Sequence, residues 1–333
     1  MKKIFITDYI KFPDLEKKIF RNEAEIICLN QKDENKFPDE ISEADGLLVW
    51  HADISDITCK KFKKNVAIIR YGVGYENINL KSIKKYNIIF ANTPDYGVDE
   101  VADTSCALIL NFVRKINLYN NHTKINLNKW QSEVININKS FPIKRTSDHN
   151  LGIIGLGRIG SSLAIKMKHF NMKVGFYDPY VTDGYEKVLG IKRFNTLDEL
   201  KSNSSIISIN ASLNLKTKNM VDEKFINSLN DNTILINTAR GQIIQNLNII
   251  LEGLKKNKLA GVGLDVLPEE PPKDTDNFIK KWKDTNNNLS DRIIINPHAG
   301  YYSTTSIKEM RIKASENMLN FLRGNKVRNI IDN

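Results

Sequence analysis

A strand that leads directly into a glycine-rich turn is the feature that most constrains how this chain can fold. Gly155, Gly157 and Gly160 follow a short apolar run in Gly-x-Gly-x-x-Gly spacing. The first glycine makes a tight turn, the second lets the backbone approach a pyrophosphate, and the third lets helix and strand pack closely. The backbone N–H groups of Arg158 and Ile159 open the following helix and would face the anion. The turn therefore predicts a dinucleotide site.

The residues after the turn continue the same unit. Ile159, Leu163 and Met167 recur at the helical period, and the apolar run 173–177 predicts a second strand that ends at Asp178. A carboxylate roughly 20 residues beyond such a turn accepts hydrogen bonds from the adenosine ribose, and its charge would repel a 2′-phosphate. These residues favour NAD over NADP. A glycine-rich turn without a ligand is the alternative, which the complete strand, helix and second strand disfavour.

Short β-branched runs alternate with helical stretches over most of the sequence, which predicts parallel sheets wound by helices. One series of expected strands comprises residues 3–7, 24–29, 46–50, 66–70 and 88–92; a second begins at residue 151 and continues through 173–177, 205–210, 233–237, 261–266 and 293–296. With 333 residues the chain is long enough for two domains. We expect an α/β fold of two Rossmann-like doubly wound parallel-sheet domains, with the active site in the cleft between them.

The second series of strands opens with the dinucleotide turn, so it should form the cofactor domain. We expect residues 100–302 to form an NAD-binding Rossmann domain, and residues 1–99 with 303–333 to form a substrate-binding domain. A long helix over 98–113 is a candidate hinge, and its apolar side is broader than one packing partner requires. The apolar side of this helix is expected either to form a homodimer contact through the NAD-binding domain or to be buried within the monomer.

Composition narrows the class of protein. The net charge is +10, but the lysines are scattered along the chain. This distribution predicts a solvated basic surface that steers anions, and it argues against a nucleic-acid partner. No apolar run is long enough to span a membrane and the start lacks a signal-peptide core, so we expect a cytoplasmic protein with no membrane partner. Cys28, Cys59 and Cys106 lack the spacing of a disulfide framework or a zinc site, and no metal is expected.

Three polar residues stand just beyond strand ends of the second series, where open parallel sheets bind ligands. Arg240 can clamp a carboxylate with two parallel hydrogen bonds, and His298 can exchange a proton near neutral pH. Glu270, if it pairs with the histidine, would stabilise the charged imidazolium and fix the tautomer. Taken singly, each residue also fits a structural role as a surface ion pair, a loop acid or a satisfied histidine.

Several motifs, in order and over nearly the whole chain, resemble the D-isomer-specific 2-hydroxyacid dehydrogenase family. They are Arg70-Tyr71-Gly72-Val73-Gly74-Tyr75-Glu76-Asn77-Ile78, Asn92-Thr93-Pro94-Asp95-Tyr96-Gly97-Val98-Asp99-Glu100-Val101-Ala102, the glycine turn, Asn237-Thr238-Ala239-Arg240-Gly241, Leu264-Asp265-Val266 with Glu270-Pro271-Pro272, and Pro297-His298-Ala299-Gly300. The runs 142–145, 298–303 and 322–329 resemble the branch related to C-terminal-binding proteins and to phosphoglycerate and glyoxylate type dehydrogenases.

The resemblance implies an NAD-dependent oxidoreductase that interconverts a 2-keto acid and a D-2-hydroxy acid by hydride transfer. It implies that Arg240 binds the carboxylate and carbonyl side of the substrate, that His298 is the acid/base and that Glu270 partners His298. The backbone N–H groups of Val73 and Gly74 would help to hold the substrate carboxylate.

The resemblance also implies cofactor contacts outside the glycine turn. Asp265 would contact the nicotinamide end and Thr104 would approach the phosphates. Thr238 and Ala239, in the motif that carries the arginine, are expected in the same cofactor site. One departure from the family pattern is Ser-Leu-Asn at 212–214, where members read Pro-Leu-Thr; it lies on the adenosine side and bears on affinity more than on chemistry.

The particular 2-hydroxy acid does not follow from the sequence. Arg70 and Tyr301 are expected to bind substrate, while the roles of Trp50, His51 and the loop 273–291 stay open. Trp50, Tyr75, Tyr301 and Tyr302 stand on segments that could face the cleft, and aromatic walls there would favour a side chain larger or flatter than that of glyoxylate. Packing of these rings between the lobes is the alternative.

An NAD(H)-sensing, dimerising binding protein with little turnover, related to C-terminal-binding proteins, is the alternative function. Retention of Arg240, Glu270 and His298 together favours an enzyme, because a pure binder has no need of an acid/base set.

Overall fold

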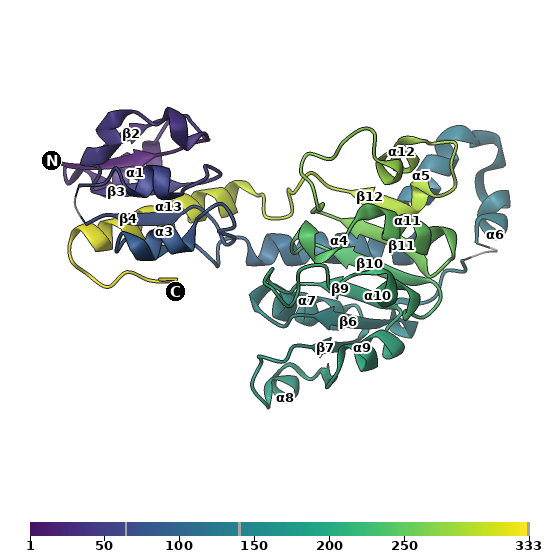
Figure 1. Ribbon diagram of the computed structural model, residues 1–333. Helices are drawn as coiled ribbons and strands as arrows, with labels where there is room; N and C mark the ends of the chain where they lie inside the picture. Colours follow the sequence, from purple (N-terminus) through teal and green to yellow (C-terminus); the bar gives the residue numbers. More distant parts are fainter. Residues whose placement is uncertain (64, 139–140, 332–333) are drawn as a thin grey trace. The chain divides into compact units, whose positions relative to one another are not determined.

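The computed structural model describes residues 1–63, 65–138 and 141–331, and it consists of two compact units (Figure 1). Unit 1 comprises Met1–Gly97 and Tyr302–Asn333, and unit 2 comprises Val98–Tyr301. The boundaries expected from the sequence, 99/100 and 302/303, lie two residues and one residue further along the chain. Each unit is built around its own parallel sheet. Over the described ranges, none of the helices has both the length and the apolar character needed to cross a lipid bilayer.

Unit 1 contains a five-stranded parallel sheet in the order β2-β1-β3-β4-β5. Its strands are β1 (Lys2–Ile6), β2 (Ala24–Cys28), β3 (Gly46–Val49), β4 (Ala67–Arg70) and β5 (Ile89–Ala91). Its helices are α1 (Asp14–Phe20), α2 (Asp56–Cys59), α3 (Leu80–Lys85) and α13 (Thr304–Leu322), with the 3-10 turns η1 (Glu34–Lys36) and η2 (Asp39–Glu43). The strand order reverses between β1 and β3, and a reversal of this kind is where open α/β sheets bind ligands.

Helix α13 ties together segments of unit 1 that are far apart in sequence. It packs on β3 and β4 and against α1, and the residues after it bring Ile330 into an antiparallel bridge with Ala91 of β5. Glu16 of α1 is fully buried; its carboxylate accepts from Arg311 Nη2 of α13 at 2.6 Å and from the Tyr71 hydroxyl at 3.1 Å. A buried carboxylate needs such partners, so this network fixes α13 on α1.

Unit 2 contains a seven-stranded parallel sheet in the order β12-β11-β10-β9-β6-β7-β8. Its strands are β6 (Asn150–Ile154), β7 (Lys173–Tyr177), β8 (Lys192–Arg193), β9 (Ile206–Ile209), β10 (Thr233–Asn237), β11 (Leu259–Leu264) and β12 (Ile293–Ile295). The order from β8 to β11 is the 3-2-1-4-5-6 order of dinucleotide-binding folds. The switch point therefore lies between β6 and β9.

The helices of unit 2 cover both faces of this sheet. They are α4 (Val98–Arg114), α5 (Ile116–Ile125), α6 (Val134–Ile137), α7 (Arg158–His169), α8 (Tyr185–Leu189), α9 (Leu197–Asn203), α10 (Glu223–Asn227), α11 (Leu247–Lys255) and α12 (Asn277–Lys283), with the 3-10 turns η3 (Leu127–Glu133), η4 (Thr146–Asp148), η5 (Gly241–Ile243) and η6 (Ser290–Arg292). Covered faces explain why the strands are apolar along their length: Leu235 and Ile236 point to opposite faces and both are fully buried.

The broad apolar side of α4 is buried within unit 2. The helix packs on β10, β11 and α7, and both Leu108 and Ile109 are buried. Glycine in β11 makes the close approach possible, because a Cβ at Gly261 would lie 2.6 Å from the ring of Phe112. Of the two sequence alternatives for this side, burial in the monomer is therefore the one observed.

The segment after α4, residues 116–135, is called the arm (Figure 1). Exposed apolar side chains gather on it instead. Between 58% and 78% of the surface of five large apolar residues is exposed there: Ile116, Ile125, Leu127, Trp130 and Ile135. The arm is tied to the rest of unit 2 by Asn121, whose Nδ2 donates to Asp291 Oδ1 at 2.9 Å.

Candidate active site

The glycine turn lies at the switch point of the unit 2 sheet. Gly155 adopts a φ of +91°, and a Cβ there would lie 2.6 Å from the backbone nitrogen of Ala211, which follows β9. A Cβ at Gly160 would lie 2.2 Å from the carbonyl oxygen of Gly155. At Gly157, by contrast, a Cβ would meet no described atom within 4 Å. Gly155 and Gly160 thus allow the turn to close tightly, and Gly157 leaves open space in front of it.

The open space faces the amino end of α7. Gly157 is the N-cap and provides no side-chain cap, so the backbone N–H groups that begin with Arg158 and Ile159 are left for an anion. Asp178 closes the other side: its Oδ2 accepts from the N–H of Leu156 at 2.8 Å. A cradle without side chains, an uncapped helix and a carboxylate at the end of β7 fit the pyrophosphate and the ribose of a dinucleotide.

Arg240 follows β10 and is held by the backbone around it. Asn237, fully buried at the end of β10, accepts from the N–H of Ala239 at 3.0 Å and donates to the carbonyl of Arg240 at 3.0 Å. The Arg240 guanidinium donates to the carbonyl of Ala239 at 2.8 Å. Gly241 has no room for a side chain, since a Cβ would lie 1.8 Å from the carbonyl oxygen of Leu267. This contact sets the Arg240 turn against the segment that leads to Glu270.

Glu270 and His298 form a hydrogen-bonded pair. The distance from His298 Nδ1 to Glu270 Oε2 is 2.8 Å, and Glu270 Oε1 accepts from the N–H of Leu267 at 2.8 Å. Burial of Glu270 opposes its ionisation, but the hydrogen bond and the charge of His298 outweigh burial and lower the pKa of the carboxyl from its usual 4.5, with a smaller contribution from Arg240. An ionised Glu270 only accepts, so Nδ1 of His298 carries the proton.

Asp265 holds the turn that carries His298. Its side chain is 2% exposed and its Oδ1 accepts from the N–H groups of Ala299 and Gly300, each at 3.0 Å. Burial raises the pKa of the Asp265 carboxyl even though these hydrogen bonds oppose the rise. His298 itself adopts a φ of +54°, an uncommon conformation for a residue other than glycine. The predicted contact of Asp265 with the nicotinamide stays a prediction; its observed task is to position the turn.

The remaining cofactor residues also have partners within unit 2. The Thr104 hydroxyl donates to the carbonyl of Gly300 at 3.3 Å, and the hydroxyls of Thr238 and Ser105 lie 2.7 Å apart. Thr104 and Thr238 thus join α4 to the ends of β10 and β12 beside Ala239. Among the residues that the structure describes, no three His, Cys, Asp or Glu side chains gather in a way that would hold a metal ion.

The substrate residues predicted in unit 1 follow β4. The Arg70 guanidinium donates to the carbonyl of Tyr71 and lies beneath Gly72, which has a φ of +129°. The carbonyl of Val73 accepts from Asn92 Nδ2 at 2.7 Å. These contacts support the loop that runs to Gly74. The rings of Tyr301, in unit 2, and His298 are nearly perpendicular, with centroids 6.3 Å apart.

An ionisable pair at the switch point of unit 1 was missed from the sequence. Asp8 follows β1, is 3% exposed and accepts from the N–H of His51 at 3.0 Å, while His51 Nδ1 lies 3.4 Å from its Oδ2. The His51 ring stacks on the ring of Trp50, and the Tyr9 ring is tilted against both. A buried acid directly after the first strand is the signal that could have found it. Asn237 was missed as well, because a motif does not reveal which backbone groups a side chain holds.

The strand order of unit 2, the glycine turn and the acid at the end of β7 define a dinucleotide-binding protein of the Rossmann type. The family model described as the D-isomer specific 2-hydroxyacid dehydrogenase, NAD binding domain, matches residues 106–300, and the chain belongs to that family. The predictions of the family, of two parallel-sheet α/β domains and of NAD as the cofactor are confirmed.

Individual relatives agree with this assignment. A glyoxylate reductase from Pyrococcus horikoshii is 29% identical over 97% of this chain and 93% of its own length. A D-lactate dehydrogenase from Aquifex aeolicus, solved with NAD and lactic acid, is 26% identical with a TM-score of 0.77, over 97% of this chain and 96% of that chain. A glyoxylate reductase from Paecilomyes thermophila, at 22% identity over 99% of this chain and 98% of that chain, shares the fold with a TM-score of 0.83.

Proposed function

We propose that this protein interconverts a 2-keto acid and a D-2-hydroxy acid, with NAD as the redox partner and His298 as the acid/base. The observation that carries the proposal is the 2.8 Å hydrogen bond between His298 and Glu270 at the edge of a dinucleotide-binding sheet. Arg240, Glu270 and His298 follow β10, β11 and β12, which are adjacent in that sheet, so their side chains converge at its carboxyl edge. The relatives, a glyoxylate reductase and a D-lactate dehydrogenase, support a small 2-keto acid as the substrate class.

Glu270 determines what His298 can do. Because Nδ1 donates to the ionised Glu270, only Nε2 remains to exchange a proton with substrate. In the reductive direction His298 is charged, and Nε2 gives its proton to the keto oxygen while the carbonyl carbon receives the hydride. In the oxidative direction neutral His298 takes the hydroxyl proton. Bound NADH or NAD⁺ supplies or accepts the hydride.

Arg240 supplies the positive charge next to this pair. A guanidinium binds a carboxylate through two parallel hydrogen bonds and polarises a neighbouring carbonyl oxygen. Asn237 and Ala239 hold the Arg240 backbone, so the side chain leaves the sheet edge in a fixed direction. The roles of Arg70, Val73, Gly74 and Tyr301 toward the substrate are part of the same proposal.

The decisive experiment compares His298→Ala, Arg240→Ala and the wild type in a screen of 2-keto acids with NADH. His298→Ala should lower kcat by at least about 10²-fold and leave the Kd of NADH unchanged. Arg240→Ala should raise KM as well as lower kcat, because the clamp acts in both ground and transition states. His169→Ala, an exposed histidine on α7, is the matched control and should behave as the wild type.

Two outcomes would contradict the proposal. Normal turnover by His298→Ala, on an acid that the wild type reduces, would remove the acid/base assignment. Uniform inactivity of the wild type on all keto acids, together with NADH-dependent assembly in sizing experiments, would favour the NAD(H)-sensing binding protein.

We also propose a homodimer through unit 2, in which a second copy covers the arm. Five large apolar side chains within 116–135 are more than half exposed, and exposed apolar surface concentrated on one segment is typical of a protein interface. Ile125→Glu combined with Leu127→Glu should shift the sedimentation coefficient from dimer to monomer. Leu215→Glu, at a position that is 97% exposed outside the arm, is the control. A monomeric wild type, or a double variant that stays dimeric, would refute this interface.

A further inference from the structure

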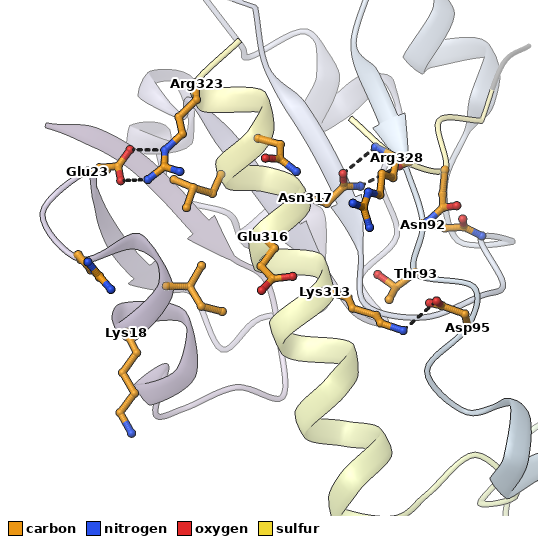
Figure 2. Close-up of a pocket in the computed structure, with 15 residues that line it drawn as sticks. Lys18, Glu23, Asn92, Thr93, Asp95, Lys313, Glu316, Asn317, Arg323 and Arg328 are labelled. Carbon is orange, nitrogen blue, oxygen red and sulfur yellow. Dashed lines mark hydrogen bonds and ion pairs between the residues drawn. The ribbon is translucent and has the colours of Figure 1, made fainter. Parts of the chain in front are cut away.

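Unit 1 carries a groove that no step of the proposed reaction uses. It has a volume of about 850 Å³ and runs across α13, from the end of α1 to the segment that follows α13 (Figure 2). This volume is in the range of small-molecule sites, roughly 300–1,000 Å³. All of its lining residues belong to unit 1.

The lining is strongly charged, with an excess of positive groups. Five cationic and three acidic side chains face the groove. Two cations are already neutralised, because Arg323 Nε lies 2.9 Å from Glu23 and Lys313 Nζ lies 2.8 Å from Asp95. The charged side-chain groups of the other three make no hydrogen bond or ion pair with any residue in the described ranges; they belong to Lys18, Arg21 and Arg328.

The backbone holds two of these three cations in place. Asn317 of α13 is 7% exposed; its Oδ1 accepts from the N–H of Arg328 at 2.8 Å and its Nδ2 donates to the carbonyl of Arg328 at 2.8 Å. Arg21 adopts a φ of +49° at the end of α1, and its N–H donates to the carbonyl of Lys17 at 2.9 Å. Both guanidinium groups therefore start from fixed backbone positions at the edges of the groove.

One acid separates the two cationic ends. Glu316, on the exposed side of α13, lies between Lys18 at one edge of the groove and Arg328 at the other (Figure 2). A carboxylate at the centre repels negative charge there and accepts hydrogen bonds from hydroxyl groups. The arrangement favours a ligand with an anion at each end and a neutral, hydroxyl-bearing middle.

We propose that this groove binds a sugar bisphosphate, with one phosphate at Lys18 and Arg21, the other at Arg328, and sugar hydroxyls at Glu316. Arginine suits phosphate because its planar donors form paired, charge-assisted hydrogen bonds. A ligand with a single phosphate reaches only one end of the groove. Affinity therefore depends on the number of phosphates that the ligand carries.

The groove also contacts the loop predicted to bind the substrate carboxylate, so a bound ligand would act on catalysis. Asn92 and Thr93 line it; Asn92 Nδ2 donates to the carbonyl of Val73 at 2.7 Å, and the N–H of Thr93 donates to the carbonyl of Gly72 at 3.0 Å. A phosphate at Arg328, beside these two residues, would change how firmly the loop is held. This second step rests on the proposed function and predicts a change in the KM of the keto acid.

The test is a calorimetric titration of fructose 1,6-bisphosphate into the full chain saturated with NADH, so that the glycine turn is occupied. Low salt, about 50 mM, keeps screening weak. The wild type should bind the bisphosphate at least ten-fold more tightly than fructose 6-phosphate. Arg21→Gln or Arg328→Gln should each reduce the affinity for the bisphosphate to that for the monophosphate. Lys81→Gln removes the same charge from an exposed lysine on α3 outside the groove and should leave both affinities within two-fold.

Each other outcome decides a separate point. Equal affinity for the two sugars, or equal weakening by Lys81→Gln, would mean general attraction to a basic surface and would overturn the site. Bisphosphate binding that follows the predicted pattern without any change in the KM of the keto acid would overturn the coupling alone. If the wild type reduces no keto acid, the proposed function fails while the titration still decides the groove.

Discussion

At the scale of single residues, Glu270 divides its two carboxylate oxygens between two tasks. Oε1 accepts from the N–H of Leu267 and so shapes the segment on which Glu270 stands, while Oε2 accepts from His298. Gly241 packs directly against the carbonyl of Leu267, which links the Arg240 turn to the same segment. The acid thus stabilises the local structure and holds the imidazole of the proposed acid/base through Nδ1.

Glu270→Gln should change how stability depends on pH. The folded protein lowers the pKa of Glu270 from 4.5, so the ionised carboxylate stabilises the fold above about pH 4.5 and this contribution is lost as the pH falls through the lower folded-state value. When the pH is lowered from about 7 to about 3, the Tm of the wild type should therefore fall more steeply than the Tm of Glu270→Gln. Glu269→Gln, on the neighbouring exposed acid, should follow the wild type; parallel curves for all three proteins would contradict the assignment.

Which site residues could be predicted depends on what fixes their positions. Arg240, Glu270 and His298 were predicted because each follows a strand, and parallel strands bring their carboxyl ends to one edge. The tasks of Asn237 and Asp265 were not predicted, because both side chains hold backbone N–H groups of turns, and a turn conformation is not visible in residue types. The roles of all these residues in turnover stay predictions.

At the scale of elements, α7 is a helix whose amino end is left uncapped in favour of a ligand. Serine, threonine, aspartate or asparagine caps several other helices of unit 2, such as α9, α10 and α11, whereas α7 begins at Gly157 without a side-chain cap. A capped end would satisfy the N–H groups that an anion needs. The helix therefore gives up local stability at the place where the cofactor binds.

Gly157→Asp should separate these two effects. The position has an extended backbone and open space around its Cβ, so the new carboxylate can cap α7 and raise the free energy of unfolding by a few tenths of a kcal/mol. The same charge would repel the pyrophosphate, and the Kd of NADH should rise at least about ten-fold. Asn246→Asp, a cap of α11, is the control and should leave the Kd of NADH unchanged. Unaltered NADH binding by Gly157→Asp would contradict the proposed use of this helix end.

Elements differed in how well the sequence located them. The apolar strands β6, β7 and β10 were predicted to within a residue or two, because buried parallel strands are continuous apolar runs. Strand β8, two residues long, was not predicted, because two residues carry no periodicity. The apolar side of α4 was recognised, but only packing within unit 2 decides that the monomer itself buries it.

At the scale of the whole molecule, unit 1 is assembled from two segments with all of unit 2 between them in sequence. The buried pair of Glu16 and Arg311 joins these segments. Burial opposes the charged form of Arg311, yet the carboxylates of Glu16 and Asp14 outweigh burial and raise its pKa. The charge on this guanidinium is therefore retained inside unit 1.

Arg311→Gln should destabilise unit 1 strongly, because it leaves a buried carboxylate without a cation. Removal of one partner from a buried ion pair costs about 3–5 kcal/mol. Unfolding in urea, monitored by hydrogen exchange of the β3 and β4 amides, would measure this loss in the free energy of unfolding. Arg323→Gln removes the same charge from the C-cap of the same helix, but its pair with Glu23 is about half exposed, so the loss should stay below about 1 kcal/mol. Similar losses for the two variants would contradict the special role of Arg311.

The bridge between Ala91 and Ile330 has a consequence for the order in which the protein folds. During synthesis the five strands of unit 1 leave the ribosome long before α13 and Ile330, which cover and complete them. Unit 2 is a single continuous segment, so it can fold while the nascent strands of unit 1 still expose apolar faces. Long-range contacts form slowly, and exposed strand edges favour aggregation. Chaperone dependence in the cell should therefore arise from unit 1, although unit 2 is the larger of the two.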